Sequence, residues 1–159
     1  MRTWLQRFAN GVGGGLFLAL FVVFLVQITA RFGFNKPLAW TDEAAVILYV
    51  WVILWGAAMM VPAREHVMFD LLWNSVGRRG KQAMAVVGHS VIGGLSLWAL
   101  PATWDYVTFM SREGTPVLGL PFMWVFMPFV LLLVALALRS AWAVWQALRG
   151  RGLEADLRV

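Results

Sequence analysis

The segment Ala63–Asp70, which reads AREHVMFD, gathers side chains that could carry chemistry. Glu65, His66 and Asp70 offer hard ligands for a metal ion, and the i, i+4 spacing of His66 and Asp70 would place them together on a helix. The spacing matches no defined metal-binding motif such as H-E-x-x-H. We therefore favour a structural interpretation, in which His66 bonds a neighbouring loop or subunit and Arg64 lies with Glu65 at the level of the lipid headgroups.

A second histidine, His89, lies inside an apolar run over residues 83–100. An ionisable group within a membrane span is a functional candidate by default. Small residues around it would let another helix approach closely, however, and these are Gly88, Ser90, Gly93, Gly94 and Ser96. We favour a neutral histidine that bonds a neighbouring backbone or hydroxyl group over proton or ion coupling. The two histidines lie in different segments, so we expect no shared metal, and His89 alone cannot supply the paired axial ligands of a haem bundle.

The sequence contains no recognisable catalytic motif. The absence of cysteine excludes disulfides, thiolate metal sites, iron–sulfur clusters and cysteine nucleophiles. No serine stands in a G-x-S-x-G segment. The glycine-rich stretch Gly11–Gly15 opens an apolar run and does not follow a strand, so it is neither a P-loop nor a dinucleotide-binding turn. The sequence therefore predicts that this chain is not an enzyme and holds no cofactor or metal.

The composition points to lipid as the environment of the chain. Of its 159 residues, 61% are hydrophobic and only 13% are charged, and it contains ten tryptophans and eleven phenylalanines. One small soluble core cannot bury so much apolar surface, so the excess must face a membrane. The formal charge of +5 does not indicate nucleic-acid binding, because the bases are scattered at the ends of apolar runs and form no recognition motif.

Four apolar runs are long enough to cross a bilayer, and each should be helical because lipid offers no partners to unpaired backbone groups. We predict an all-α membrane protein, a single membrane domain over residues 1–159, with spans at 12–30, 44–61, 83–100 and 117–138. Amphipathic patterns outside these runs predict short helices on the membrane surface at about 1–10, 67–77 and 139–149. The prolines of the fourth run are expected to bend it rather than to build a site.

The distribution of lysine and arginine predicts the orientation of the spans. With four spans, both termini and the middle loop share one side, which would hold ten bases against three on the other: Arg2, Arg7, Arg64, Arg78, Arg79, Lys81, Arg139, Arg149, Arg151 and Arg158, against Arg31, Lys36 and Arg112. Basic residues are enriched in cytoplasmic loops. The sequence therefore predicts that both termini are cytoplasmic.

The second span has a distinct start. In WTDEAA, Thr41 could cap the helix, Asp42 and Glu43 suit the positive end of its dipole, and Trp40 would anchor at the membrane interface.

Further along the same span, Trp51 and Trp55 are spaced i, i+4 and could face lipid or pack against another membrane protein. Gly56, with Ala57 and Ala58 after it, would provide a surface for close contact. None of the four spans contains Asp, Glu, Lys or Arg. A self-sufficient carrier usually has a charge or a broken helix in the membrane, so an accessory subunit is favoured.

The ordered set of motifs resembles the small membrane subunit of TRAP transporters, the DctQ-like family. The resemblance covers Trp40–Trp73 and rests on WTDEAAVILYVWVILWGAA, with its acidic pair, aromatic residues and Gly-Ala step, and on AREHVMFDLLW, with its basic residue, histidine and hydrophobic-Asp-Leu-Leu run. Two positions depart from the family pattern. Val46 stands where the family often has a base, so any ion pair that this base normally makes is absent, and Asp42 stands where glutamate is frequent.

The resemblance implies a function that depends on partners. A periplasmic binding protein captures an organic acid, a large multi-span subunit carries it inward with sodium, and the small subunit braces the scaffold of the large one in a bacterial or archaeal cytoplasmic membrane. Lipids are expected partners and nucleic acids are not. His66→Ala is then expected to lower complex yield or uptake without abolishing substrate capture. Two alternatives stay open: an independent carrier or channel lined by His89 and Ser90, and a membrane-anchor redox subunit that uses His66 as a ligand.

Overall fold

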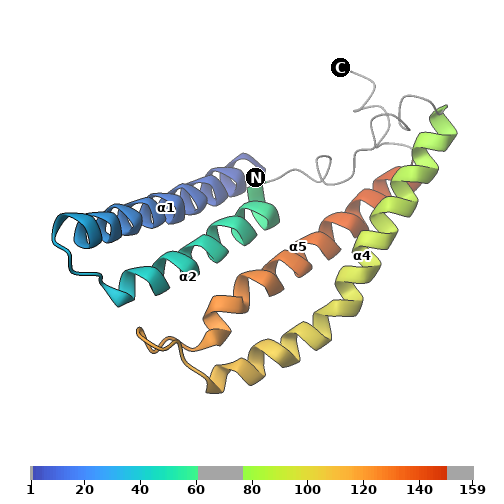
Figure 1. Ribbon diagram of the computed structural model, residues 1–159. Coiled ribbons are helices and arrows are strands. Elements are labelled where there is room, and N and C mark those ends of the chain that lie inside the picture. Colours follow the sequence, from blue (N-terminus) through green and yellow to red (C-terminus); the bar gives the residue numbers. More distant parts are fainter. Residues whose placement is uncertain (1, 61–76, 150–159) are drawn as a thin grey trace. The chain divides into compact units, whose positions relative to one another are not determined.

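The computed structural model describes residues 2–60 and 77–149, and these residues form an all-α fold. In chain order the elements are α1 (Arg2–Ile28), a π-helical turn η1 (Thr29–Gly33), α2 (Ala39–Trp55), a π-helical turn η2 (Gly56–Met60), α4 (Arg78–Phe109), a 3-10 turn η4 (Met110–Arg112) and α5 (Phe122–Leu148) (Figure 1). Arg64, His66 and Asp70, and nearly all of the predicted surface helix 67–77, lie outside the described residues.

Four helices of the described residues are long and apolar enough to cross a membrane. They cover Trp4–Gly33, Ala39–Met60, Gly80–Arg112 and Phe122–Leu148. Each contains most of one predicted span, so the all-α fold and the four apolar helices are confirmed. In all four, most of the apolar window is not buried inside the chain. Such surface must be covered by lipid or by another protein.

The helices extend further than the hydropathy of the sequence predicted. α1 joins the predicted surface segment 1–10 and the first span in one continuous helix. α4 continues through Pro101 beyond the predicted end at residue 100. Its last turns stay helical because they are packed: Val107 is fully buried, and the Tyr106 ring lies 5.9 Å from the ring of Phe126 on α5. α5 begins at Phe122 rather than at residue 117, because the preceding residues form a hydrogen-bonded turn.

The chain divides into two compact units, one formed by residues 1–60 and 103–132 and the other by residues 61–102 and 133–159. α4 and α5 each contribute to both units. The division leaves the single domain over 1–159 a prediction.

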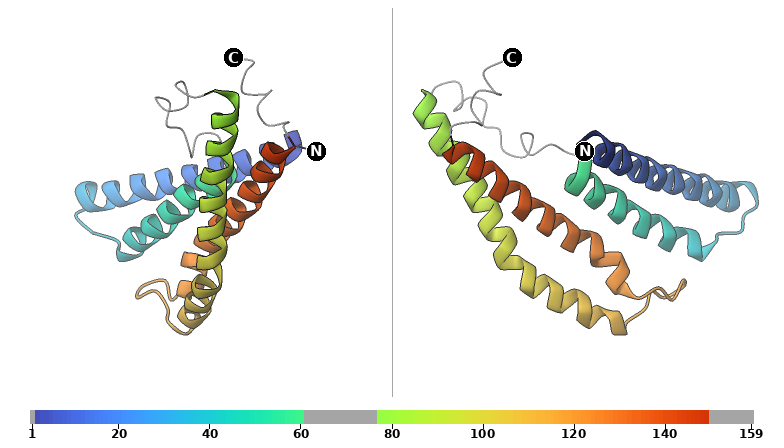
Figure 2. Two further views of the ribbon diagram at one scale, coloured as in Figure 1. Left: turned by 90° about the vertical axis from the view of Figure 1, so that its right-hand side faces the viewer. Right: turned by 180° about the vertical axis from the view of Figure 1, so that it is seen from behind.

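In the first unit, α1 and α2 run side by side in opposite directions in every view (Figures 1 and 2). Their contact depends on small residues. Ala9 and Gly13 are buried on α1, and a Cβ atom added at Gly13 would lie 2.6 Å from the sulfur of Met60 and 3.5 Å from the Trp55 ring. The pair Ala9 and Gly13 thus forms a small-x-x-x-small contact of the kind that brings membrane helices together.

In the second unit, α4 and α5 pack along a face of α5 that repeats every three or four residues. The buried positions of this face are Leu133, Ala137, Ser140 and Ala147. Gly93 of α4 lies against Ser140, since a Cβ atom added at Gly93 would be 2.9 Å from the Cβ of Ser140. Near the start of α4, the Gln82 amide donates a hydrogen bond to the carbonyl oxygen of Ala147 at 2.7 Å. These contacts align the two helices as antiparallel neighbours.

Candidate functional site

The start of α2 carries several hydrogen-bonded polar side chains, although the predicted cap was wrong. The helix begins at Ala39, with Leu38 in an extended conformation at the N-cap and no side-chain cap. Thr41 is fully buried, and its hydroxyl donates a hydrogen bond to the Leu38 carbonyl at 2.6 Å. Thr41 is therefore the third residue of the helix, and its hydroxyl bonds the backbone of Leu38, the residue that precedes the helix. Trp40 is partly exposed next to it.

Asp42 connects the start of α2 to the end of α1. Its carboxylate accepts a hydrogen bond from the side-chain amide of Gln27. Gln27 is the only strongly polar side chain of the first apolar run. The bond gives this amide a partner close to the end of the span, where an unpaired amide in lipid would cost free energy. The acidic residue thus has a structural role beyond its position at the helix dipole.

Glu43 binds a segment distant in the sequence. Its two carboxylate oxygens accept hydrogen bonds from the backbone N–H groups of Val117 and Leu118, at 2.8 Å and 3.1 Å. Two backbone donors satisfy the carboxylate, so Glu43 needs no base at position 46. Val46 is exposed. The departure from the family pattern therefore does not leave Glu43 without a partner, and the acid anchors the chain between α4 and α5 to α2.

The anchored chain is itself a tight hydrogen-bonded turn. Gly114 and Pro121 form an antiparallel bridge. The Thr115 side chain accepts a hydrogen bond from the N–H of Leu120 at 3.0 Å, and its backbone N–H donates to the Leu120 carbonyl at 2.9 Å. Gly119 adopts a φ of 66°, which favours glycine. The turn is therefore built from its own bonds and is fixed to α2 by Glu43.

This arrangement defines the α2-start cluster, which consists of Gln27, Asp42, Glu43 and Thr115 together with the turn 113–122. The carboxylates of Asp42 and Glu43 are used in internal bonds, and the apolar side chains Val117, Leu118 and Leu120 are exposed. The cluster can hold a shape and offer apolar contacts. It presents no free pair of acids for proton transfer or cation binding.

The two tryptophans of α2 also make internal bonds. The Trp51 indole N–H donates to the carbonyl oxygen of Trp124 on α5 at 3.1 Å, and the Trp55 indole N–H donates to that of Ala9 on α1 at 3.0 Å. Both bonds lie within the first unit. Their role as anchors for a partner stays a prediction, but the structure shows that they bind α2 to its two neighbours.

The remaining predicted positions are not brought into one site. An added Cβ at Gly56 would meet nothing within 4 Å, whereas Ala58, two residues later, is almost fully buried. His89 is half-buried in the second unit and makes no hydrogen bond with a described residue. Arg64, His66 and Asp70 lie outside the described residues, so their predicted role in the turn after α2 stays a prediction.

The described residues also give no indication of a cofactor or metal site. Across residues 2–60 and 77–149, no group of three or more His, Cys, Asp or Glu side chains could hold a metal ion. Every buried side-chain nitrogen and oxygen in these ranges has a hydrogen-bond partner.

Sequence reasoning missed Gln27, Thr115 and the turn before α5. Gln27 carried a signal, because a lone amide in an apolar run needs a partner. Thr115 carried a weaker one, since Pro116, Gly119 and Pro121 around it are turn residues rather than helix formers. The pairing of Glu43 with Val117 had no signal in a single sequence, because the two positions are 74 residues apart.

Comparison with known proteins connects these features to one family. The family described as "Tripartite ATP-independent periplasmic transporters, DctQ component" matches residues 1–150. The sialic acid TRAP transporter permease protein SiaT of Haemophilus influenzae is 37% identical over 71 residues, which are 45% of this chain and 12% of that protein. The C4-dicarboxylate TRAP transporter small permease protein DctQ of Vibrio cholerae is 26% identical over 88 residues, 55% of this chain and 38% of that protein.

The matched parts thus span less than two thirds of the length of either relative. The match to the family is broader, and it covers all four apolar helices together with Asp42 and Glu43. The family is one of transporter components, and its members are not enzymes. This chain belongs to the DctQ component family of the tripartite ATP-independent periplasmic (TRAP) transporters.

Proposed function

We propose that this chain braces the scaffold of a larger TRAP permease subunit during sodium-coupled uptake of an organic acid, which a periplasmic binding protein delivers. One observation carries the proposal. Asp42 and Glu43 at the start of α2 are bound within the chain, and the four apolar runs 12–30, 44–61, 83–100 and 117–138 contain no Asp, Glu, Lys or Arg. Such helices have no charged side chain within the membrane that could bind a solute. They are suited to a structural role as a rigid support. Sodium coupling and substrate binding then belong to the partner chains.

The internal bonds explain how the chain could resist deformation. α2 is linked to α1 by Trp55, to α5 by Trp51 and to the turn before α5 by Glu43. In lipid, breaking an interhelical hydrogen bond leaves polar groups without water to replace the partner. The first unit is thereby held together by directional contacts as well as by apolar packing.

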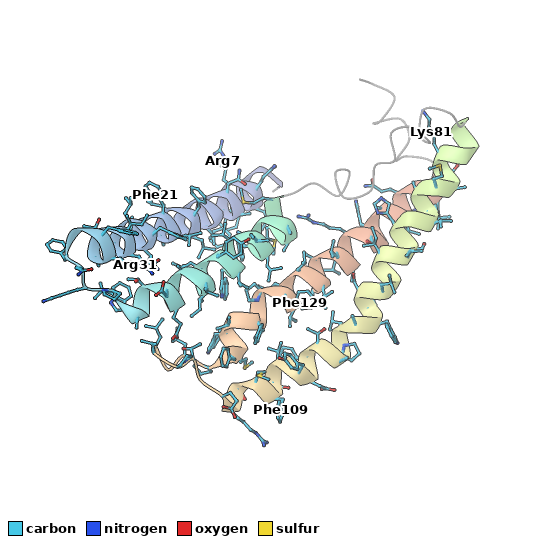
Figure 3. All side chains as sticks on the ribbon, viewed as in Figure 1. Arg7, Phe21, Arg31, Lys81, Phe109 and Phe129 are labelled. Carbon is cyan, nitrogen blue, oxygen red and sulfur yellow. The ribbon has the colours of Figure 1, made fainter. Side chains whose placement is uncertain are left out.

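The apolar surface of the helices supports the need for a partner. On α1, large side chains are exposed along most of the helix, among them Phe17, Leu18, Phe21, Val22, Phe24 and Leu25, and Phe21 marks this surface in Figure 3. Lipid can cover this face, and so can a helix of a larger permease. The relative SiaT supports the second possibility, since the segment similar to this chain is only 12% of a much longer permease protein.

The proposal also includes the topology of the chain and the membrane in which it lies. The excess of bases on one side predicts that both termini are cytoplasmic, in a bacterial or archaeal cytoplasmic membrane. The turn 113–122, the segment 34–38 and the start of α2 would then face the periplasm. Cysteine accessibility provides a test in this cysteine-free chain. A single cysteine at Asn35 should react with an impermeant maleimide in intact cells, whereas one at Gln146 should react only after the cells are opened.

The function is tested by reconstitution. The chain, a co-encoded large permease subunit and a binding protein loaded with radiolabelled organic acid are combined in proteoliposomes with an inward sodium gradient. We expect uptake only when all three proteins and sodium are present, and no flux through this chain alone. Solute flux through the chain by itself, lost on His89→Ala, would instead support an independent carrier. Haem absorbance or bound metal in the pure chain would support a redox anchor, and either result would overturn the bracing proposal.

A further inference from the structure

The face of α5 that points away from α4 has a composition unlike that of the rest of the helix. The buried positions of α5 in the second unit pack on α4, and the opposite positions Leu138, Trp142, Trp145 and Arg149 recur at the same helical spacing. Leu138 is 68%, Trp142 58% and Trp145 41% exposed. These four residues, here called the α5 outer face, form an ordered series from apolar through aromatic to cationic along the helix.

Three of these side chains contact one another. The Trp142 and Trp145 rings lie 5.0 Å apart, and the Arg149 guanidinium carbon lies 3.9 Å from the centre of the Trp145 ring. Arg149 therefore folds back toward the preceding turn and rests over an aromatic face, a favourable position for a cation. The indole N–H groups of both tryptophans and the guanidinium N–H groups donate no hydrogen bond to a described residue. Arg149 has five such N–H donors and each tryptophan has one, so the stacked group has seven.

The length of α5 places this group at the edge of the hydrocarbon layer. α5 has 27 residues, or about 40 Å, whereas the hydrocarbon layer accommodates about 20 helical residues. A span that starts at Phe122 leaves the layer near residue 141. Trp142 and Trp145 then lie at the interface, where tryptophan is favoured. Because Arg149 folds back over Trp145, its charge lies about 6 Å beyond the layer, at the depth of lipid phosphates.

The charge of the second unit is of one sign. Its described residues include Arg78, Arg79, Lys81, Arg139 and Arg149 and contain no Asp or Glu. Lys81 lies near the start of α4 (Figure 3), and the bond from Gln82 to Ala147 places that start next to the last turn of α5. A phosphate at the α5 outer face would therefore meet the charge of Arg149, and the described residues of this unit supply no Asp or Glu to oppose it.

We propose that the α5 outer face binds an anionic phospholipid. Its phosphate takes hydrogen bonds from Arg149 and from the Trp145 indole, its glycerol ester region lies against Trp142, and an acyl chain runs along Leu138. The proposal depends on the order of the side chains along the helix: the charge of Arg149, the rings of Trp145 and Trp142 and the apolar Leu138 follow the order of phosphate, glycerol ester and acyl chain in a lipid. Arg149 favours a headgroup of net negative charge over a zwitterionic one, because a basic side chain near the membrane surface is attracted to anionic lipids.

The test measures lipid retained by the full-length chain. The chain is purified into nanodiscs of equal phosphatidylcholine and phosphatidylglycerol, and the lipids that stay bound on release are counted by native mass spectrometry. We expect phosphatidylglycerol to be enriched about five-fold at the tightest site, the effect of one basic side chain at a surface. Arg149→Gln should remove the enrichment, and Trp145→Phe should reduce it. Arg112→Gln, which removes an exposed charge from the first unit, is the matched control and should leave it unchanged.

Several outcomes would overturn the proposal. One is the absence of enrichment in the unaltered chain. Another is an equal loss in Arg149→Gln and Arg112→Gln, which would indicate net charge rather than a site. A third is that phosphatidylglycerol is enriched only after Glu154 and Asp156 are changed to Gln and Asn. In that case the acidic C-terminal residues, and not a lipid, would bind the α5 outer face of the unaltered chain. If Arg149→Gln leaves lipid binding intact and releases the large permease subunit, the occupant is that subunit. Circular dichroism checks that each variant stays helical.

Discussion

The carboxylate of Glu43 on α2 accepts a hydrogen bond from the backbone N–H of Val117 at 2.8 Å, although the two residues are 74 positions apart in the chain. A second bond joins the same carboxylate to the N–H of Leu118. The acid therefore acts as an anchor for a turn between two apolar helices. This single side chain links the entrance of the second span to the entrance of the fourth.

Glu43→Gln should loosen that turn. A glutamine amide offers one acceptor oxygen and a nitrogen that only donates, so it cannot accept bonds from two N–H groups in the same way. The substitution also removes the charge that strengthens both bonds. We expect the backbone N–H groups of Val117 and Leu118 to exchange with deuterium several-fold faster, measured by mass spectrometry of the purified chain. Glu113→Gln removes an exposed acid from the same turn and should leave their exchange unchanged; equal acceleration in both variants would contradict the anchoring role.

Thr115→Val should destabilise the turn by removing the side-chain acceptor of the Leu120 N–H. Valine keeps the shape of threonine but offers no oxygen, and a lost intramolecular hydrogen bond costs about 0.5–1.5 kcal/mol. The free energy of unfolding can be measured by SDS titration of the chain in mixed micelles. Thr115→Ser retains the hydroxyl and should lose less stability. If the serine variant is the weaker of the two, the methyl group rather than the hydrogen bond stabilises the turn.

Trp55→Phe should weaken the contact of α1 with α2. Phenylalanine keeps an aromatic ring near Gly13 but cannot donate to the Ala9 carbonyl, which now accepts the indole N–H at 3.0 Å. The expected loss is about 0.5–1.5 kcal/mol in the free energy of unfolding by SDS titration. Trp98→Phe is the control, because Trp98 is 80% exposed and its indole donates to no described residue. A loss at Trp98 as large as that at Trp55 would attribute the effect to aromatic area instead.

Gly93→Ala should disturb the packing of α4 on α5. The new Cβ would lie 2.9 Å from the Cβ of Ser140, an atom that cannot rotate away, and overpacking of this kind costs about 1–3 kcal/mol. Gly94→Ala changes the neighbouring residue where nothing lies within 4 Å, and it should be neutral or stabilise by up to about 1 kcal/mol through helix propensity. Thermal unfolding in detergent compares the two variants.

A second-site change makes the same prediction more specific. Ser140→Gly removes the Cβ that the new alanine would meet, so Gly93→Ala with Ser140→Gly should recover part of the loss. The single Ser140→Gly variant gives the loss of stability caused by the new glycine, and this loss is subtracted from that of the double variant. Failure of the pair to recover any stability would show that the two residues do not oppose each other across the helices.

The sequence by itself determined the number and position of the apolar helices. A hydrocarbon layer rejects charged side chains and unpaired backbone groups, so hydropathy alone locates the spans. It also determined the family, since WTDEAA and the aromatic run after it are readable without a structure, and the match to the DctQ component confirms it. What hydropathy could not locate were the helix ends. α4 continues past Pro101 because Val107 and Tyr106 are packed, and packing partners are not visible in a local window.

Only the tertiary structure decided which partners the polar side chains take. Glu43 lay near a helix start in the sequence and was expected to serve the dipole, yet its oxygens bind Val117 and Leu118. For Trp55 the sequence predicts contact with lipid or a partner, which stays a prediction, and the structure adds that its indole donates a hydrogen bond to Ala9. Hydrogen bonds are short and directional, so they depend on the relative placement of distant segments. Hydropathy averages over a span and predicts burial in lipid, but it contains no information on that placement.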